Sequence, residues 1–408
     1  MTKINFIISC IVLPVVILSS CSKPGDSVNP TPPHTDTVII TPPPAPTLDT
    51  SVKGFLYMSL DNALTKINLE TKSVVWQKYL YHGDHNGMEF NNGYLYHGDY
   101  SGLTCYNPVT GNRVWEFGWV SYYSNNTFSR YAFSDSLIFA VSATTAYDVS
   151  SLYCLNKRTG TLVWKNKIDT ATWALGGYAC APQVDNDKVI VLVRDYSGHV
   201  KLVAYNIWTG QRVWDAGIND QLTLNFKVDN GKIYSTGHNV FCYDAATGNL
   251  VWQKTIPLAP LYSGLYALTS FIDGNKIIIA GSPTAATCAV LTLDKNTGAI
   301  LSNQPINKEV GSCMYRDNVF YLGYPDSNYF SLTAYNISDM SAKWTYKHTA
   351  YYPQTVTSKN IIITGVDSAV KVLDLNGNLV KRTPAMGTYF GSFIYIDSAS
   401  NVFPQQWQ

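Results

Sequence analysis

The sequence has few charged residues and no concentration of positive charge. Asp, Glu, Lys and Arg make up 14% of its 408 residues, with 29 basic against 28 acidic side chains. No run of basic residues is longer than two. Because nucleic acids and anionic membrane surfaces are recognised through concentrated positive charge, this balance argues against either as the main partner.

Sequence signatures of catalysis and of helices are also lacking. No phosphate-binding glycine loop, nucleophile motif or pair of spaced carboxylates stands out, and no stretch shows sustained helical periodicity. We therefore assign no catalytic residue, and an enzyme would need residues that converge only in space. The hydrophobic content of 46% and the aromatic content of 13% indicate a folded protein with a large core.

The apolar stretch at the N-terminus is too short to be a membrane span. Lys3 precedes "INFIISCIVLPVVIL" (4–18), whose 15 residues fall short of the roughly 20 that a spanning helix needs. The following "LSSC" places small residues before a cysteine. This pattern is typical of a bacterial lipoprotein, so we expect a signal peptide over residues 1–20, cleavage before Cys21, and lipid on its thiol.

Residues 21–50 are predicted to be a proline-rich linker behind the lipid anchor. Eight prolines fall among residues 22–50. We expect an extended polyproline conformation that reaches at most roughly 90 Å, at about 3.1 Å per residue. The folded domain is then expected over residues 51–408. The anchor predicts a location at the outer membrane, and leaves open whether the protein lies on the periplasmic or the surface-exposed side.

An eleven-residue pattern recurs through the folded domain, as in "CLNKRTGTLVW" (154–164) and "CYDAATGNLVW" (242–252). The third position is Asn or Asp in all eight copies, at Asn68, Asn107, Asn156, Asn206, Asp244, Asp294, Asn336 and Asp374. Successive copies are 37 to 50 residues apart, with a mean of about 44. A period of that size in strand-forming sequence is the signature of propeller blades.

Each part of the pattern has a structural role. The residues before the Asn or Asp, such as "HVKLVAY" (199–205), read as a buried or half-buried strand. The Asn or Asp side chain starts a turn by bonding the backbone, and the glycine that follows supplies positive φ. The last position offers a large apolar face suited to packing between blades. It is tryptophan in six copies, at Trp76, Trp115, Trp164, Trp214, Trp252 and Trp344.

Two further strand runs lie between successive copies, for example in "NFKVDNGKIYST" (225–236). They predict four antiparallel strands per unit and an all-β, eight-bladed β-propeller. The domain opens with a blade that lacks its innermost strand, and "GTYFGSFIYIDS" (387–398) is an inner strand that lacks its blade. Because an unclosed ring leaves two long sheet edges, we expect strands from both termini to pair in blade 1.

The pattern A-x-D-x-x-T-G-x-x-x-W resembles the tryptophan-docking motif of the PQQ-like, quinoprotein-type repeat family. "AYNIWTGQRVW" (204–214) fits it with Asn206 in place of the acid, and the resemblance covers about residues 52–408. The family contains large PQQ-dependent dehydrogenases and smaller propeller lipoproteins that bind other proteins, including the one in the outer-membrane β-barrel assembly machine. The motif marks architecture in both. Departures that predict looser packing in four blades occur at Lys66, Lys72, Ser302, Met340 and Lys381.

The sequence is similar to the lipoproteins more than to the dehydrogenases. Resemblance to a dehydrogenase implies two adjacent cysteines beside the quinone, carboxylate and Asn ligands for calcium, a catalytic Asp, and long insertions that build the pocket. No two cysteines are adjacent, and blades of about 44 residues leave little beyond four strands and their turns. No cofactor is therefore expected.

A local duplication brings histidines and acids together between residues 79 and 102. His and carboxylate side chains could meet around a metal such as zinc. Their spacing matches no compact ligand signature, and ordinary turn chemistry is the alternative explanation. No metal is assigned, and the weak candidates are His82, Asp84, His85, His97 and Asp99.

The cysteines of the folded domain show no pairing rule. Three of them occupy the first position of the repeat, at Cys105, Cys154 and Cys242. They read as small core residues in different blades, too far apart to form a disulfide. The pairing of the others stays open, at Cys180, Cys288 and Cys313.

The connectors that lead from one blade to the next carry many aromatic residues and are expected to open on one face of the ring. Tyrosine combines apolar area with a polar tip and loses little entropy when fixed, which suits a protein or sugar surface. Packing of these rings onto the blades is the alternative explanation. The candidate binding face comprises Tyr79, Tyr81, Trp119, Tyr122, Tyr123, Trp173, Tyr178, Tyr262, Tyr266, Tyr351 and Tyr352.

From these patterns we expect a non-enzymatic envelope lipoprotein that acts as a binding or scaffold module. Its partner would be an envelope protein or a glycan, with the membrane reached through Cys21 and no nucleic acid bound. One alternative is an envelope enzyme, either a degenerate quinoprotein dehydrogenase or an unrecognised hydrolase. Another is a carbohydrate-binding lipoprotein.

Overall fold

The computed structural model describes most of the residues after position 53. These are residues 54–60, 63–80, 87–98, 102–118, 127–143, 151–168, 172–174, 181–195, 199–220, 225–237, 239–256, 269–284, 287–306, 311–326, 329–348, 352–364, 369–385 and 390–404. By its internal contacts the chain divides into residues 1–41 and 42–408, and the described residues all belong to the second unit. Within those ranges, no helix has the length and apolar character that crossing a membrane requires.

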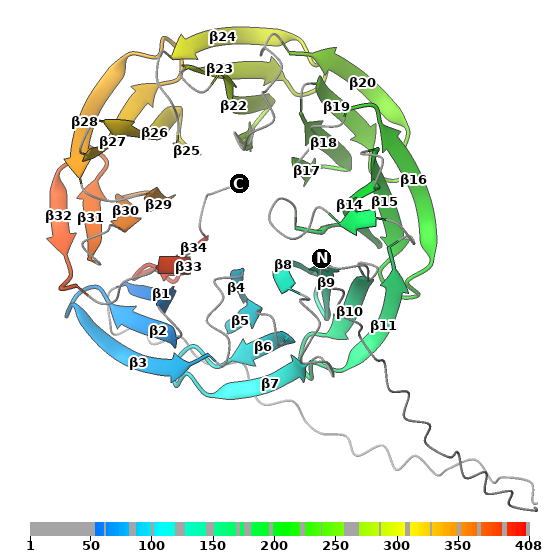
Figure 1. The fold of residues 1–408 in the computed structure, drawn as a ribbon, viewed down its shortest axis with the longest axis horizontal. Coiled ribbons are helices and arrows are strands. Elements are labelled where there is room, and N and C mark those ends of the chain that lie inside the picture. Colours follow the sequence, from blue (N-terminus) through cyan, green and yellow to red (C-terminus); the bar gives the residue numbers. More distant parts are fainter. Residues whose placement is uncertain are drawn as a thin grey trace, which may run out of the picture. The chain divides into compact units, whose positions relative to one another are not determined.

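The described residues form eight antiparallel sheets, which Figure 1 shows as the blades of a ring. This confirms the predicted all-β, eight-bladed propeller. From the inner to the outer edge, blade 1 contains β33 (Phe390–Ile396), β1 (Phe55–Leu60), β2 (Ala63–Asn68) and β3 (Ser73–Tyr79); blade 2 contains β4 (Met88–Asn91), β5 (Tyr94–Gly98), β6 (Gly102–Tyr106) and β7 (Arg113–Gly118); blade 3 contains β8 (Thr127–Phe133), β9 (Leu137–Ala143), β10 (Ser151–Asn156) and β11 (Leu162–Lys167).

Blade 4 differs slightly, because two short inner strands, β12 (Thr172–Ala174) and β13 (Gln183–Asp185), pair with the same neighbour. Its other strands are β14 (Lys188–Asp195), β15 (Val200–Asn206) and β16 (Arg212–Ile218). Blade 5 contains β17 (Asn225–Asp229), β18 (Lys232–Thr236), β19 (Asn239–Asp244) and β20 (Leu250–Thr255); blade 6 contains β21 (Thr269–Asp273), β22 (Lys276–Thr284), β23 (Thr287–Asp294) and β24 (Ile300–Ile306); blade 7 contains β25 (Ser312–Arg316), β26 (Val319–Asp326), β27 (Tyr329–Asn336) and β28 (Ala342–His348); blade 8 contains β29 (Tyr352–Val356), β30 (Asn360–Thr364), β31 (Val370–Asp374) and β32 (Leu379–Arg382).

The ring closes in blade 1 with strands from both ends of the domain, as predicted. β33 pairs antiparallel with β1, with Phe55 opposite Ile396 and Phe393 opposite Met58. A further strand, β34 (Val402–Pro404), which the sequence did not predict, pairs with β33. Blade 1 is therefore a five-stranded sheet, with the extra strand at its inner edge.

Two faces of the ring follow from the antiparallel order within each blade. The first-to-second and third-to-fourth strand turns share one face, which we call the turn face; in blade 4 these are residues 185–188 and 206–211. The second-to-third loops and the connectors between blades share the other, which we call the connector face. The folded domain begins on the turn face, because the Leu69 N–H in a turn of blade 1 donates to the Gly54 carbonyl at 3.2 Å.

The hydrophobic core lies between the blades. One cluster combines Tyr234 and Cys242 of blade 5 with Ile277 and Ile279 of blade 6, and the other clusters likewise span neighbouring blades. Alternate residues of each central strand face opposite neighbours, so these strands are buried on both sides. This explains their nearly continuous apolar sequences.

Every outer strand contains a β-bulge at the tenth position of the repeat. In blade 3, Cys154 pairs with Trp164 but Leu155 pairs with Leu162, which leaves Val163 without a partner across the ladder. The extra residue breaks the alternation of side chains. As a result the ninth and tenth residues are exposed on the rim, at 47% for Leu162 and 48% for Val163, whereas the tryptophan after them turns toward the next blade.

Candidate functional site

The tryptophans of the repeat dock between blades, as predicted. Trp115 of blade 2 is only 9% exposed, and its Nε1–H donates to the Lys157 carbonyl of blade 3 at 3.1 Å. The same bond links four other pairs of blades, from Trp76 to Pro108 at 3.2 Å, Trp164 to Ile207 at 2.9 Å, Trp214 to Ala245 at 3.2 Å and Trp344 to Leu375 at 2.8 Å. These residues are therefore structural.

Each docked indole lies against the turn glycine of the following blade. A Cβ atom added at Gly160 would stand 2.4 Å from Cε3 of Trp115, and one added at Gly248 would stand 2.7 Å from Cδ2 of Trp214. Both glycines have positive φ, 70° and 74°. Glycine is thus required twice over, by the backbone conformation and by the ring above it. The same contact joins Gly111 to Trp76, Gly210 to Trp164, Gly298 to Trp252 and Gly377 to Trp344.

The departures from the motif fall at two junctions between blades. Blade 6 ends in Ser302 in place of tryptophan, and the next turn has Met340 in place of glycine. Blade 8 ends in Lys381, and the next turn, in blade 1, has Lys72. Both non-glycine residues keep the left-handed conformation, at φ 53° and 59°. Glycine is therefore lost only where no indole lies above it, a pairing that is visible in the sequence but was not recognised there.

Other apolar contacts fill these two junctions. Met340 packs against the core cluster between blades 6 and 7, which includes Phe320. At the junction of blades 8 and 1, Phe403 of β34 packs in one cluster with Ile362 of blade 8 and Leu56 of blade 1. The extra C-terminal strand thus supplies contacts at the junction that closes the ring.

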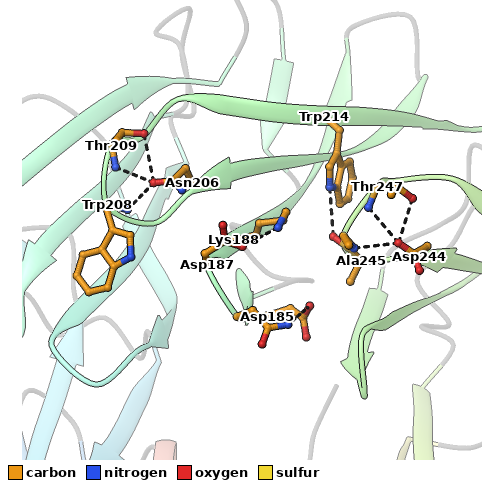
Figure 2. A network of polar contacts seen from close by, with 12 residues as sticks. Asp185, Asp187, Lys188, Asn206, Trp208, Thr209, Trp214, Asp244, Ala245 and Thr247 are labelled. Atoms are coloured by element: carbon orange, nitrogen blue, oxygen red, sulfur yellow. Dashed lines mark hydrogen bonds and ion pairs between the residues drawn. The ribbon is translucent and has the colours of Figure 1, made fainter.

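The Asn and Asp residues of the repeat are occupied in building the turns, as Figure 2 shows for two blades. Asn206 Oδ1 accepts the backbone N–H groups of Trp208 and Thr209, both at 3.0 Å. Asp244 Oδ1 accepts the N–H and the hydroxyl of Thr247, at 3.1 and 3.0 Å. A hydrogen bond from Lys232 lowers the pKa of Asp244 below its ordinary value, so this carboxylate stays ionised and is a poor general base.

The cysteines whose side chains are described are buried free thiols. Burial raises the pKa of Cys105 and Cys154 to about 12, and that of Cys242 and Cys313 to about 11. Because the thiolate is the reactive form, these groups are inert at neutral pH. The prediction that the repeat cysteines are small core residues is confirmed. Cys180 and the side chain of Cys288 lie outside the described part.

Of the weak metal candidates, only His97 falls within the described residues. It lies in β5 and is 1% exposed, which places it in the core between blades. His82, Asp84, His85 and Asp99 lie outside the described residues. The described ranges contain no group of three or more potential metal-ligating side chains.

The candidate binding face lies mostly outside the described residues. Tyr79 is described at the connector end of β3 and is 76% exposed, the highest value among the large apolar side chains described. Trp173 and Tyr352 lie in β12 and β29, where the backbone alone is described. Outside the described residues are Tyr81, Trp119, Tyr122, Tyr123, Tyr178, Tyr262, Tyr266 and Tyr351.

An exposed tryptophan on the turn face was not singled out by sequence reasoning. Trp208, at the tip of a blade 4 turn, is 59% exposed. The available signal was its position, since it stands inside the turn of the repeat and outside the docking column.

The fold and the docked tryptophans define a propeller of PQQ-like repeats, and comparison with known proteins specifies the family. The sequence matches the model of the family described as "Outer membrane protein assembly factor BamB" over residues 99–224, 197–266 and 236–389. The chain belongs to this family. No curated protein matched the sequence.

Solved structures show the same architecture at low sequence identity. The structure of BamB from Moraxella catarrhalis aligns with a TM-score of 0.55 and 18% identity, covering 78% of this chain and 95% of that one. A europium-containing methanol dehydrogenase aligns with a TM-score of 0.59 and 14% identity, covering 78% and 81%. A computationally designed protein, Ika8, aligns with a TM-score of 0.52 and 16% identity, covering 78% and 94%. These similarities show the fold alone.

The thiols of this chain do not fit the quinone site that the dehydrogenases imply. That site has two adjacent cysteines, whereas Cys105, Cys154, Cys242 and Cys313 each stand in a different blade. No two cysteines are adjacent anywhere in the sequence. We therefore derive no reaction step that involves the quinone.

Proposed function

We propose that this chain is a non-enzymatic binding module of the bacterial cell envelope, held at the outer membrane by lipid on Cys21, which engages a protein partner. The match to the family of an outer membrane protein assembly factor over residues 99–389 carries the proposal. The sequence pattern before Cys21 supports the envelope location.

The chemistry of the described side chains supports binding over catalysis. The repeat acids for which a shift is resolved have lowered pKa values because they accept hydrogen bonds inside turns, as Asp294 does from Thr297 and Asp374 does from Asn378. The described thiols are held protonated by burial. A catalytic acid, base or nucleophile needs a pKa near the working pH or a lowered one for a thiol, and these groups are shifted the other way.

The connector face is the surface that we assign to the partner. Tyr79, at the connector end of β3, exposes 76% of its surface, and aromatic side chains of this kind anchor protein interfaces. Trp119, Tyr122 and Tyr123 lie in the next connector along the chain and are the residues we expect to contribute most.

The binding test compares partner recovery by variants of the full chain from detergent-solubilised envelopes. Replacing Trp119, Tyr122 and Tyr123 by alanine together is expected to reduce recovery at least tenfold, because interface aromatics often contribute 2 kcal/mol or more. The control is Leu162→Ala with Val163→Ala, which removes exposed apolar area from the rim. Equal recovery by both variants, with both folded, would place the partner elsewhere.

The anchor is tested separately. Cys21→Ala should release the protein from the membrane fraction or leave its precursor uncleaved, because lipidation requires the thiol. A mature variant that stays bound to the membrane contradicts the lipid anchor.

An enzymatic role is tested with the quinone itself. The purified full chain, given PQQ and calcium, should not reduce an electron-accepting dye with alcohol or aldose substrates. Dye reduction that depends on both additions would replace the binding proposal by the dehydrogenase alternative, and specific signals on a glycan array would replace it by a carbohydrate-binding role.

A further inference from the structure

Trp208 lies in a turn that does not need an aromatic residue. It occupies the fifth position of the repeat in blade 4, where only its backbone N–H takes part in the turn, donating to Asn206 Oδ1 at 3.0 Å. Its side chain is 59% exposed. In the other blades, the same position is taken by Glu70, Val109, Arg158, Ala246, Asn296, Ser338 and Asn376. The turn therefore forms equally well around small, polar and charged residues, and the indole has no role in folding that the repeat reveals.

The other turn of blade 4 lies directly beside this tryptophan. The Ile207 N–H donates to the Asp187 carbonyl at 2.9 Å, which joins the two turns. Figure 2 shows Trp208 on one side of this second turn, with Asp185, Asp187 and Lys188 along it. Asp187 forms an ion pair with Lys188 at 2.6 Å, and Asn186 Nδ2 donates to Asp185 at 3.1 Å.

The surface around Trp208 is held in place before any partner arrives. The Trp164 indole of blade 3 donates to the Ile207 carbonyl at 2.9 Å, and the Asn166 amide donates to the Gly210 carbonyl. A ring on a fixed turn loses little conformational entropy on binding, so more of its contact energy is retained as affinity.

The turn face of blades 4 to 6 has an excess of negative charge. Its turns contain six aspartates and four lysines, Asp185, Asp187, Asp229, Asp244, Asp273 and Asp294 against Lys188, Lys232, Lys276 and Lys295. Three of the lysines are already paired, with Asp187 at 2.6 Å, Asp244 at 2.9 Å and Asp229 at 2.6 Å. The charge that remains is therefore negative, beside an exposed indole.

We propose that Trp208 and the acidic turns of blades 4 to 6 form a second docking surface, on the turn face, for a protein segment that presents an arginine or lysine side chain. The cation would lie over the indole, which is the aromatic ring that attracts cations most strongly. Its charge would be stabilised by Asp185 and Asp187, and arginine could also bond a carboxylate through two N–H groups. This inference extends the proposed binding function to a face that carries none of the predicted connector residues.

The experiment measures binding of two synthetic peptides to the full chain in detergent. One peptide alternates glycine, serine and arginine, and the other has citrulline in place of each arginine, which keeps the shape and removes the charge. The arginine peptide is expected to bind more tightly, and binding should weaken as salt screens the charges. Trp208→Ala should weaken it about fivefold or more, and Trp208→Phe should weaken it less, since phenylalanine keeps a smaller ring.

The chain itself provides matched controls. Ala246 occupies the position of Trp208 in blade 5, so Trp208→Ala is expected to fold, which an unchanged melting temperature would verify. Glu70→Ala removes an acid from the same repeat position in blade 1 and should leave peptide affinity unchanged. Asp185→Asn should reduce the preference for arginine over citrulline.

Three results would overturn the proposal: equal affinity for the two peptides, unchanged affinity in folded Trp208→Ala, or binding of neutral oligosaccharides that is lost in that variant. The last result would make Trp208 a sugar-stacking residue. Partner recovery that depends on the connector residues is an independent measurement, so the failure of either proposal can be distinguished from that of the other.

Discussion

Replacing the turn glycine beneath a docked tryptophan should destabilise the ring by two separable effects. Gly160 has φ +70°, and an added Cβ would lie 2.4 Å from Cε3 of Trp115. The backbone conformation alone costs an alanine about 1–2 kcal/mol. Displacing the indole adds the loss of its bond to the Lys157 carbonyl, about 1 kcal/mol, and part of its burial, about 1–2 kcal/mol. The total for Gly160→Ala is about 3–5 kcal/mol.

Gly231 provides the matched control. It has nearly the same φ, +71°, but no atom lies within 4 Å of the place where its Cβ would stand. Gly231→Ala should therefore cost only the backbone term, about 1–2 kcal/mol. With an unfolding entropy of about 2.1 cal/mol/K per residue, each kcal/mol lowers the melting temperature of a domain this large by roughly 1–2 °C.

The assay is thermal unfolding followed by near-ultraviolet circular dichroism, which detects the packing of the tryptophans. A drop of about 5 °C for Gly160→Ala and about 2 °C for Gly231→Ala is expected from the entropy scaling. In a Trp115→Ala background, Gly160→Ala should cost no more than Gly231→Ala, because the clash has been removed. Equal costs for the two glycine variants in the wild-type background would refute the docking argument.

Three further predictions concern closure, pH and the thiols. Deleting residues 385–408 should destabilise the domain more than Phe403→Ala, itself expected to cost about 3 kcal/mol, because the deletion also removes β33; unchanged thermal unfolding would contradict the closure. A hydrogen bond from Thr297 lowers the pKa of Asp294, so its stabilising contribution is present above the unfolded pKa and lost as the pH falls through the lower folded value. The difference in melting temperature between wild type and Asp294→Asn should therefore shrink between pH 6 and pH 3; a difference that grows would contradict this. The four buried thiols should resist iodoacetamide at pH 8 until the protein unfolds, because burial raises their pKa values to about 11 or 12; rapid labelling of the native protein would show otherwise.

The fold was predictable because its determinants are local and repeated eight times. The Asn or Asp, the glycine and the tryptophan each act within one hairpin, so the period revealed the blades, and the unmatched "GTYFGSFIYIDS" revealed the closure. β34 was not predicted, because a strand of three residues has too little sequence for a pattern. The bulge at Val163 and its equivalents depends on pairing across the hairpin, which no single position reports.

The candidate site was less predictable because it depends on contacts between different repeats. The link between Trp115 and Gly160 joins residues of successive blades, so aligning the copies in columns conceals it. The exposure of Trp208 depends on which side of its turn faces solvent. Connector residues such as Trp119 lie outside the repeated pattern and outside the described residues, so their role stays a prediction.

The one-way contact between blades limits how such a ring can be rebuilt from its parts. Each blade must suit two different neighbours, since it supplies an indole to the blade after it and a turn to the blade before it. Blade 7 carries Trp344 but has Met340 at the receiving position, so it is suited to follow only a blade that ends, like blade 6, without tryptophan. Duplicating or transplanting a single blade would therefore succeed at some junctions and fail at others, according to whether the residues on both sides of each new junction match.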